Sequence, residues 1–306
     1  MRTELPLGAT GMGGYSRGVK KNASFREANA GTQLTDTDGC TRTNMVEDSK
    51  AMKVSFLVTV LNETDSLRET VDTIFALAAD SVQEVLIVIA AHTTASSRQV
   101  IRELADKYRP YVRVHEQRLP FLGGALREGF AEARGDFIML MASDLETDPT
   151  MVPRFIAAMK AGQWDIVAGS RWLEGGGFEG YSRLKLALNY LFQKLFRVLY
   201  RTDLTDLTYA YRLYRRSALD GITWEELRHP FLLECLLKPL RRGARVTELP
   251  CTWRVRAEGR SANTLLQTFR YLRTAVKTRC VPVRRFSRPV RSDTEGGQTH
   301  PADVPP

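Results

Sequence analysis

The sequence of 306 residues has a hydrophobic fraction of 43%, which is enough for a sizeable core in one domain with appendages. Its net charge of +9 favours phosphate-bearing partners (a nucleotide, a lipid phosphate, an anionic membrane or a nucleic acid) without choosing among them. No apolar run is long enough for a transmembrane helix, no signal-peptide core is visible, and the four cysteines lack paired or metal-ligand spacing, which indicates a reducing, cytoplasmic compartment.

Residues 1–50 are rich in Gly, Thr, Asn and mixed charge without periodicity, and we expect a disordered extension there. From residue 51, short apolar runs alternate with amphipathic segments. The runs predict strands at residues 54–61, 84–90, 112–115, 136–141 and 164–168. The amphipathic segments predict helices that end near residue 78 or span residues 96–108, 125–133 and 151–159. This alternation predicts an α/β fold with a mostly parallel sheet flanked by helices.

The second half of the chain is richer in helix. Helices are predicted at residues 183–201 and 231–240, strands at 209–214 and 245–249, and a basic amphipathic helix at 265–277. The last segment, residues 281–306, contains Arg, Ser, Pro and Gly and is expected to be a disordered basic tail. The folded domain should therefore span residues 51–280.

The most informative segment joins an apolar strand to three acidic residues. Asp144, Glu146 and Asp148 follow the apolar residues 137–142 at alternating positions, and Pro149 comes next. Ligands of open α/β sheets bind beyond the carboxyl ends of the strands. Asp144 and Glu146 are therefore candidate ligands of one Mg²⁺ or Mn²⁺, which would in turn hold a diphosphate. Asp148 fits better as the N-cap of the helix that begins near Pro149.

Several segments, in this order, resemble family 2 glycosyltransferases of the GT-A fold. The matching segments are residues 54–63, 124–130, 143–149 and 167–171. A further segment from Arg256 to Ser261 is similar to the closing Arg-x-x-Gly-x-Ser element of the polyprenyl-phosphate sugar synthases, the subgroup of dolichol-phosphate mannose synthase. The resemblance covers about residues 52–264.

The resemblance implies a metal-dependent, inverting enzyme that moves a sugar from a nucleotide-diphosphate sugar to a polyprenyl phosphate. The family's metal-facing positions correspond here to Ala142, Asp144 and Glu146. Arg171 matches an arginine that meets phosphate, and Arg183 is the best match for a second basic position. The expected catalytic residues are Asp144, Arg171 and Asp206. The remaining substrate-binding positions that the matching segments imply are Asn62, Glu63, Gly124, Arg256 and Ser261. Two explanations of Gly124 are equally good: a tight loop and a phosphate-binding helix N-terminus.

Two departures from the family pattern affect the metal and the donor. Ala142 stands where the first Asp of an Asp-x-Asp pair is expected, so one metal ligand is missing. Ile89 and Ala90 stand where an acidic pair should contact the nucleoside. His92, Thr93 and Thr94 are candidate substitutes, although a surface loop without a ligand role explains the histidine equally well. The donor base is therefore not inherited from the family.

The acceptor decides whether a general base is needed. A polyprenyl phosphate is already an anion and can attack without one, so the protein mainly positions it and neutralises charge. A hydroxyl acceptor, as in cell-wall or polysaccharide synthesis, needs a base, for which Asp206 and Glu234 are the candidates. Asp206 is equally plausible as a cap, and Glu234 as a paired structural carboxylate. A degenerate fold that binds a nucleotide or partner without turnover is the third alternative.

The predicted helix 183–201 has two apolar faces. One is a stripe of Leu184, Leu188, Leu191, Leu195 and Val198, which fits ordinary core packing. The other carries Phe192, Phe196 and Tyr200 near basic residues, which suits an interfacial helix on an anionic membrane. We therefore expect a protein bound peripherally to the cytoplasmic face of a membrane. A nucleic-acid partner is not expected, because the basic residues are scattered and no recognition motif is present.

Overall fold

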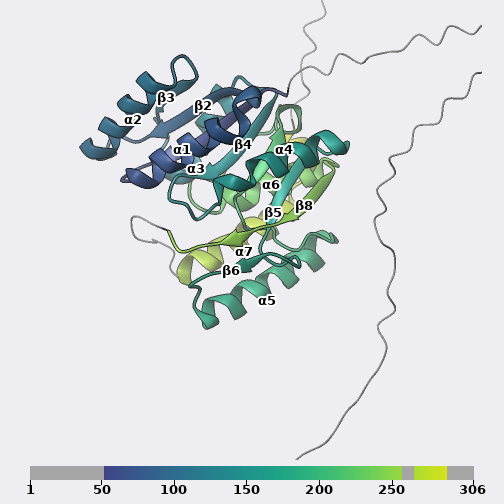
Figure 1. Ribbon diagram of the computed structural model, residues 1–306. Helices are drawn as coiled ribbons and strands as arrows, with labels where there is room; N and C mark the ends of the chain where they lie inside the picture. The colour runs from purple at the N-terminus through teal and green to yellow at the C-terminus, as the bar shows by residue number, and fades with distance from the viewer. Residues whose placement is uncertain (1–51, 257–264, 288–306) are drawn as a thin grey trace, which may run out of the picture. The chain divides into compact units, whose positions relative to one another are not determined.

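The fold is described by a computed structural model for residues 52–256 and 265–287, and its centre is a seven-stranded sheet (Figure 1). The strand order is β3–β2–β1–β4–β7–β5–β8. Only β7 runs antiparallel to its neighbours β4 and β5, so the predicted mostly parallel sheet is confirmed. The strands are β1 Val54–Val60, β2 Val82–Ile89, β3 Val112–Glu116, β4 Phe137–Ala142, β5 Ile166–Ser170, β7 Arg212–Arg215 and β8 Val246–Pro250.

Helices cover both faces of the sheet (Figure 1). One face packs against α1 Asp65–Ala78, α2 Ala95–Lys107 and α4 Val152–Ala161. The other packs against α3 Phe121–Glu132, α5 Arg183–Tyr200, α6 Phe231–Arg241 and α7 Leu265–Cys280. Successive side chains of a strand point to opposite faces, so in β1 Phe56 and Val58 join the first core and Leu57 joins the second. A strand buried on both faces is apolar throughout, which is why these strands stood out in the sequence.

A second, two-stranded sheet pairs β6 Gly177–Phe178 with β9 Thr252–Trp253 in parallel. The sequence did not predict it, because strands of two residues have no readable periodicity. The chain approaches β5 closely here: a Cβ on Gly176 would lie 2.7 Å from the carbonyl oxygen of Ser170. The small sheet thus brings the segment after β8 back to the carboxyl end of β5.

The ordered C-terminal part extends beyond the predicted boundary at residue 280. A short helix, α8 Val283–Phe286, buries the ring of Phe286 at 2% exposure. The charged groups of Lys238 and Arg241 lie 5.3 Å and 5.5 Å from the centroid of that ring. The predicted tail therefore begins too early, because one buried aromatic side chain anchors an otherwise basic segment. The rest of the predicted tail, and the predicted extension 1–50, lie outside the described residues.

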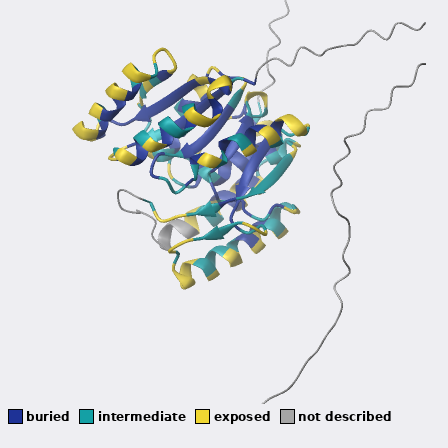
Figure 2. Ribbon diagram, viewed as in Figure 1, coloured by how far each residue is buried: buried dark blue, intermediate teal, exposed yellow. Residues whose placement is uncertain are grey.

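The two apolar faces of α5 are the reverse of what the sequence suggested. Phe196 is fully buried, and the Tyr200 hydroxyl donates a hydrogen bond of 2.8 Å to the carbonyl of Ala275 in α7. The leucine stripe faces outward instead, along the exposed side of α5 in Figure 2. Its exposed members are Leu184 at 65%, Leu191 at 62%, Leu195 at 43% and Val198 at 77%. None of the helices in residues 52–256 and 265–287 is long and apolar enough to span a membrane.

Candidate active site

The loop that follows β4 presents Asp144 and Glu146 at the carboxyl edge of the sheet. Leu145 between them has φ 62°, a left-handed conformation that is strained for leucine and is typical of functional turns. The Ser143 hydroxyl donates to the carbonyl of Thr59 at the end of β1, at 2.7 Å. The Tyr209 hydroxyl donates to the backbone carbonyl of Glu146 at 3.1 Å. Contacts to two different parts of the fold therefore hold the two carboxylates in place.

Arg256, from the segment after β9, binds both carboxylates. Its Nη2 lies 2.7 Å from Oε1 of Glu146 and 3.4 Å from Oδ2 of Asp144. Its Nε donates to the same Glu146 oxygen at 3.0 Å. A single nitrogen atom thus lies within contact distance of both side chains, and their sharing of one cation stays a prediction.

The surroundings of Asp144 disfavour its ionised form. Burial, followed by the charge of Glu146, raises the pKa of Asp144 to about 6, and Glu63 adds to the effect. Arg256 acts in the opposite direction but does not cancel it. The site therefore favours a cation, because the ionised carboxylates lie close together with only one guanidinium between them.

The donor set of this site fits a hard divalent cation. Within residues 52–256 and 265–287, no group of three or more His, Cys, Asp or Glu side chains could hold a metal, so Asp144 and Glu146 would act as a pair. Mg²⁺ is commonly bound by one or two carboxylates and completes its shell with waters and substrate phosphates. Two carboxylates at a loop beside an open sheet edge suit that mode, and they do not suit an all-protein cage.

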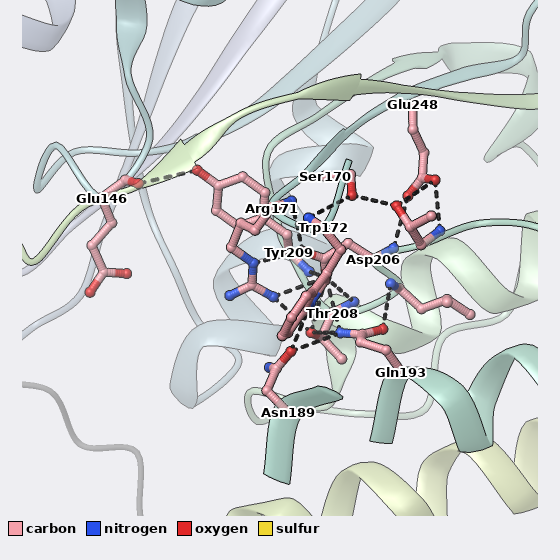
Figure 3. A network of polar contacts seen from close by, with 12 residues as sticks. Glu146, Ser170, Arg171, Trp172, Asn189, Gln193, Asp206, Thr208, Tyr209 and Glu248 are labelled. Carbon is pink, nitrogen blue, oxygen red and sulfur yellow. Dashed lines mark hydrogen bonds and ion pairs between the residues drawn. The ribbon is translucent and has the colours of Figure 1, made fainter. Parts of the chain in front are cut away.

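Arg171 and Asp206 form a buried ion pair next to this loop (Figure 3). The Arg171 Nε and Nη2 atoms donate to Asp206 Oδ2 and Oδ1 at 2.6 Å and 2.9 Å. The guanidinium also lies between two aromatic rings, 4.9 Å from the centroid of Phe178 and 4.8 Å from that of Tyr209. Burial alone would raise the pKa of Asp206, but Arg171 outweighs it and lowers that pKa below its usual value. Arg171 and Asp206 therefore neutralise each other.

This ion pair is the centre of a polar network that ties α5 to the sheet (Figure 3). Gln193 of α5 donates to Asp206 at 3.0 Å and to Thr208 at 2.7 Å. Glu248 of β8 accepts the backbone N–H of Asp206 at 2.9 Å. The carboxylate of Glu146 points away from the network, towards Arg256. Arg171 and Asp206, predicted as catalytic, are thus brought close to the Asp144–Glu146 loop, but their charged groups contact each other.

The loops after β1 and β2 hold the predicted substrate-binding residues of the N-terminal half. Glu63 accepts the backbone N–H groups of Leu61 and Asn62 at 2.8 Å and 3.1 Å, so it shapes the loop in which Asn62 is exposed. Thr93 is buried, and its hydroxyl bridges the ends of β1 and β2. His92 is exposed beside it. Substrate contacts of Asn62, Glu63, His92 and Thr93 stay predictions.

Gly124 and Arg183 make no contact with Asp144 or Glu146 within the described residues. The N–H of Gly124 donates to the carbonyl of Leu227 at 3.2 Å, and a Cβ on Gly123 would lie 2.6 Å from the backbone of Leu227. The close packing explains both glycines and occupies the amide that a phosphate would need. Arg183 is exposed at the start of α5 and forms no ion pair within the described part of the chain. Ser261 lies outside the described residues.

Two charged residues of the second half are structural. Glu234, a candidate base, forms an ion pair of 2.5 Å with Lys238 and accepts the N–H groups of Glu225 and Glu226. Arg212, which reads as a strand-surface charge in the sequence, is fully buried and donates to the carbonyls of Leu232 and Leu207. It lies on the interior, antiparallel strand β7, where both faces of the sheet are covered.

His229 is an electrostatic neighbour of this site that the sequence did not reveal. It precedes α6, and burial together with the positive charge of Arg256 lowers its pKa, so the imidazole is neutral near neutral pH. Glu146 is also one of its electrostatic neighbours. A lone histidine before a proline carries no sequence signal of a site. Only the folded structure brings the segment before α6 to the loop after β4.

Comparisons with known proteins agree with this architecture. The family model described as Glycosyl transferase family 2 matches residues 55–223. A dolichol-phosphate mannosyltransferase of Pyrococcus furiosus is 28% identical over 227 residues, which are 72% of this chain and 62% of that protein. An undecaprenyl-phosphate mannosyltransferase of Micrococcus luteus is 26% identical over 216 residues, which are 69% of this chain and 87% of that protein. The chain thus spans less than two thirds of the Pyrococcus protein.

A solved structure shares the fold. Glucosyl-3-phosphoglycerate synthase from Mycobacterium tuberculosis, in complex with Mn²⁺, UDP and phosphoglyceric acid, superposes with a TM-score of 0.58 at 17% identity. The match covers 76% of this chain and 80% of that one. At this identity the likeness concerns the fold alone, and it confirms the predicted GT-A-like arrangement.

Proposed function

The chain belongs to glycosyltransferase family 2 and is a glycosyltransferase, and we propose that it moves a sugar from a nucleotide-diphosphate sugar to a polyprenyl phosphate. One observation carries the proposal: Asp144 and Glu146 converge at the carboxyl edge of a parallel sheet, with the guanidinium of Arg256 bound to both. The names of two relatives, a dolichol-phosphate and an undecaprenyl-phosphate mannosyltransferase, support the class of acceptor.

Asp144 and Glu146 would hold Mg²⁺ or Mn²⁺ together with the donor diphosphate. When bound, such a cation neutralises the charge that develops on the leaving diphosphate. Arg256 adds a planar guanidinium that can bind phosphate oxygens through two hydrogen bonds. With the donor bound, both positive groups would lie beside the phosphate oxygens on which negative charge grows, a placement that lowers the barrier to transfer.

The ion pairs of the site favour an acceptor that is already an anion. Asp206 is bound to Arg171, and Glu234 is bound to Lys238. Neither carboxylate is placed to remove a proton from a hydroxyl group, since each is buried and neutralised by its partner. A prenyl monophosphate needs no such base.

A hydroxyl acceptor is the second candidate, and one observation favours it. His229 is half-buried and feels the charges of Arg256 and Glu146, and its lowered pKa leaves a neutral imidazole that can accept a proton. If the acceptor is a hydroxyl, His229→Gln should abolish transfer. With a prenyl phosphate acceptor the same variant should keep its activity within about tenfold of the parent.

We place the exposed stripe of α5 on the membrane that carries the acceptor, at its cytoplasmic face. Leu184, Leu191, Leu195 and Val198 share one outward side of the helix. Lys185, Lys194 and Arg201 are exposed on its flanks. An apolar stripe bordered by basic side chains suits the boundary between anionic headgroups and acyl chains.

The double variant Leu191→Ser, Val198→Ser is expected to weaken binding to anionic vesicles about a hundredfold, because each side chain contributes roughly 1.5–3 kcal/mol when buried. Its melting temperature should stay that of the parent, since both side chains are exposed. Vesicle co-sedimentation at low salt measures the binding. Leu77→Ser is the matched control, because Leu77 is 48% exposed on α1, away from α5. If the double variant and the parent bind vesicles equally well, α5 does not contact the membrane.

The donor half of the proposal predicts metal-dependent nucleotide binding. Calorimetric titration of the full chain with UDP, GDP and their sugar conjugates should give binding to one nucleotide series that strengthens at least about tenfold when Mn²⁺ or Mg²⁺ is added. Binding that ignores the metal would contradict the metal site. No binding in any combination would support a degenerate fold without turnover.

A further inference from the structure

We propose that Arg256 is an internal counterion of the Asp144–Glu146 pair, and that a divalent cation takes its place only together with a nucleoside diphosphate, which accepts the released guanidinium. This inference rests on the proposed function, because it concerns the same site. It makes Arg256 a positioning residue that couples the binding of metal to the binding of donor.

The contacts of Arg256 overlap the place of the cation. Nε and Nη2 both contact Oε1 of Glu146, at 3.0 Å and 2.7 Å, and Nη2 lies 3.4 Å from Oδ2 of Asp144. A cation bound by both carboxylates would have to lie against the positive guanidinium. The metal ion and the guanidinium therefore compete for the same two carboxylates. The side chain of Arg256 is only 24% exposed, so it is held at this position in the fold.

The competition has an electrostatic basis in the whole site. Without a cation, Glu63, Asp144 and Glu146 repel one another, and Arg256 relieves that repulsion. If Mn²⁺ or Mg²⁺ arrives alone, it gains the carboxylates but displaces or repels the guanidinium. If it arrives with a diphosphate, the guanidinium gains phosphate oxygens in exchange, through hydrogen bonds of the kind it makes with carboxylates. When metal and diphosphate bind together, the carboxylates keep a positive partner and the guanidinium keeps a negative one.

The neighbouring arginine on the same segment has other partners. Arg254, two residues earlier, pairs with Glu179 at 3.2 Å and with Asp148 at 3.5 Å. Asp148 is the N-cap of the turn at Pro149–Met151, where it accepts the N–H of Thr150. Both ion pairs of Arg254 are largely exposed to solvent and contribute little to the placement of the segment, whereas Arg256 reaches the carboxylate pair. This difference supplies a matched control.

The test measures Mn²⁺ affinity of the full chain by electron paramagnetic resonance, without nucleotide and with saturating UDP or GDP. For Arg256→Ala and Arg256→Gln, we expect Mn²⁺ alone to bind at least about tenfold more tightly than to the parent, and the enhancement by nucleotide to shrink by at least about tenfold. The glutamine variant keeps hydrogen-bonding capacity but no charge, and a thermal melt of each variant checks its fold. Arg254→Ala should resemble the parent.

The outcomes separate the inference from the function on which it rests. If Mn²⁺ alone binds both Arg256 variants as weakly as the parent, while nucleotide still enhances its binding, Arg256 is a structural tie and the inference is overturned. If Arg254→Ala changes the Mn²⁺ affinity as much as Arg256→Ala, the effect belongs to the segment and the inference is again overturned. If the parent binds neither Mn²⁺ nor nucleotide in any combination, the proposed function fails, and the inference falls with it.

Discussion

Asp144→Asn is expected to lower the rate of sugar transfer by at least about a hundredfold, because the variant loses an anionic ligand of the proposed cation. The same change should leave the metal-free protein as stable as the parent or more stable at neutral pH. Burial and the charge of Glu146 raise the pKa of Asp144 to about 6, so its ionised form is disfavoured in the fold. The shift from 3.8 corresponds to at most roughly 3 kcal/mol.

The sign of this stability effect depends on pH. A carboxylate whose pKa is raised by folding destabilises the protein above that pKa, and the penalty disappears as the group protonates. The stability gap between Asp144→Asn and the parent should therefore be widest above pH 6 and should shrink as the pH falls towards 4, which thermal melts at several pH values measure. Asp148→Asn is the matched control, because Asn caps a helix as well as Asp does. If Asp144→Asn keeps full activity, Asp144 is not a ligand of the catalytic cation.

Asp206→Asn is expected to reduce the free energy of unfolding by about 3–5 kcal/mol, because it leaves the buried guanidinium of Arg171 without its counterion. For a domain of this size, that loss corresponds to a fall in melting temperature of about 10 °C or more. Urea denaturation of the variant and the parent measures it. The pKa of Asp206 is lowered in the fold, so the contribution of the pair is present above about pH 4 and is lost as the pH falls further.

A compensating double variant distinguishes a structural role of Asp206 from catalysis. Replacing both partners with apolar side chains, as in Arg171→Met with Asp206→Leu, should recover part of the lost stability. It removes the orphaned charge but leaves Gln193 and the N–H groups of Thr208 and Tyr209 without their acceptor. If Asp206→Asn keeps the melting temperature of the parent but loses activity, Asp206 acts in the reaction, as the sequence suggested. A stable, active Asp206→Asn would contradict both roles.

The strands and helices that carry strong periodicity were predictable from the sequence. β1, β2 and β4 are apolar throughout because both of their faces are covered, and their ends lie within two residues of the predicted ends. The direction of β7 and the sheet of β6 and β9 were not predictable, because pairing direction and two-residue strands leave no local pattern. The start of β7 at Arg212, three residues later than predicted, reflects the same limit.

Helix α5 shows where periodicity stops being informative. Both of its apolar faces have helical spacing, so the sequence can locate them but cannot decide which one meets the core. Phe196 is buried because α5 packs against α7 and the second core cluster. That choice depends on a helix about 70 residues later in the chain, whose own bounds are Leu265–Cys280.

The site was predictable only where it lies on one segment. Asp144 and Glu146 follow a recognisable buried strand, so the sequence could name them together as candidate ligands. Their partner Arg256 lies 110 residues from Glu146, and Asp206 lies 35 residues from Arg171. The family resemblance named Arg256 and Arg171, and Asp206 was a candidate base. No spacing rule could show that Arg256 binds the two carboxylates or that Arg171 and Asp206 bind each other.

Transfer itself tests the central claim most directly. The full chain is incubated with a prenyl phosphate in anionic vesicles, each labelled nucleotide sugar in turn and a divalent cation, and the label is followed into the lipid and aqueous phases. The proposed function predicts that label from one donor enters the lipid phase as a prenyl-phosphate sugar, and that Asp144→Asn or a chelator prevents it. Label that reaches only soluble hydroxyl acceptors, or donors that are never consumed, would contradict it.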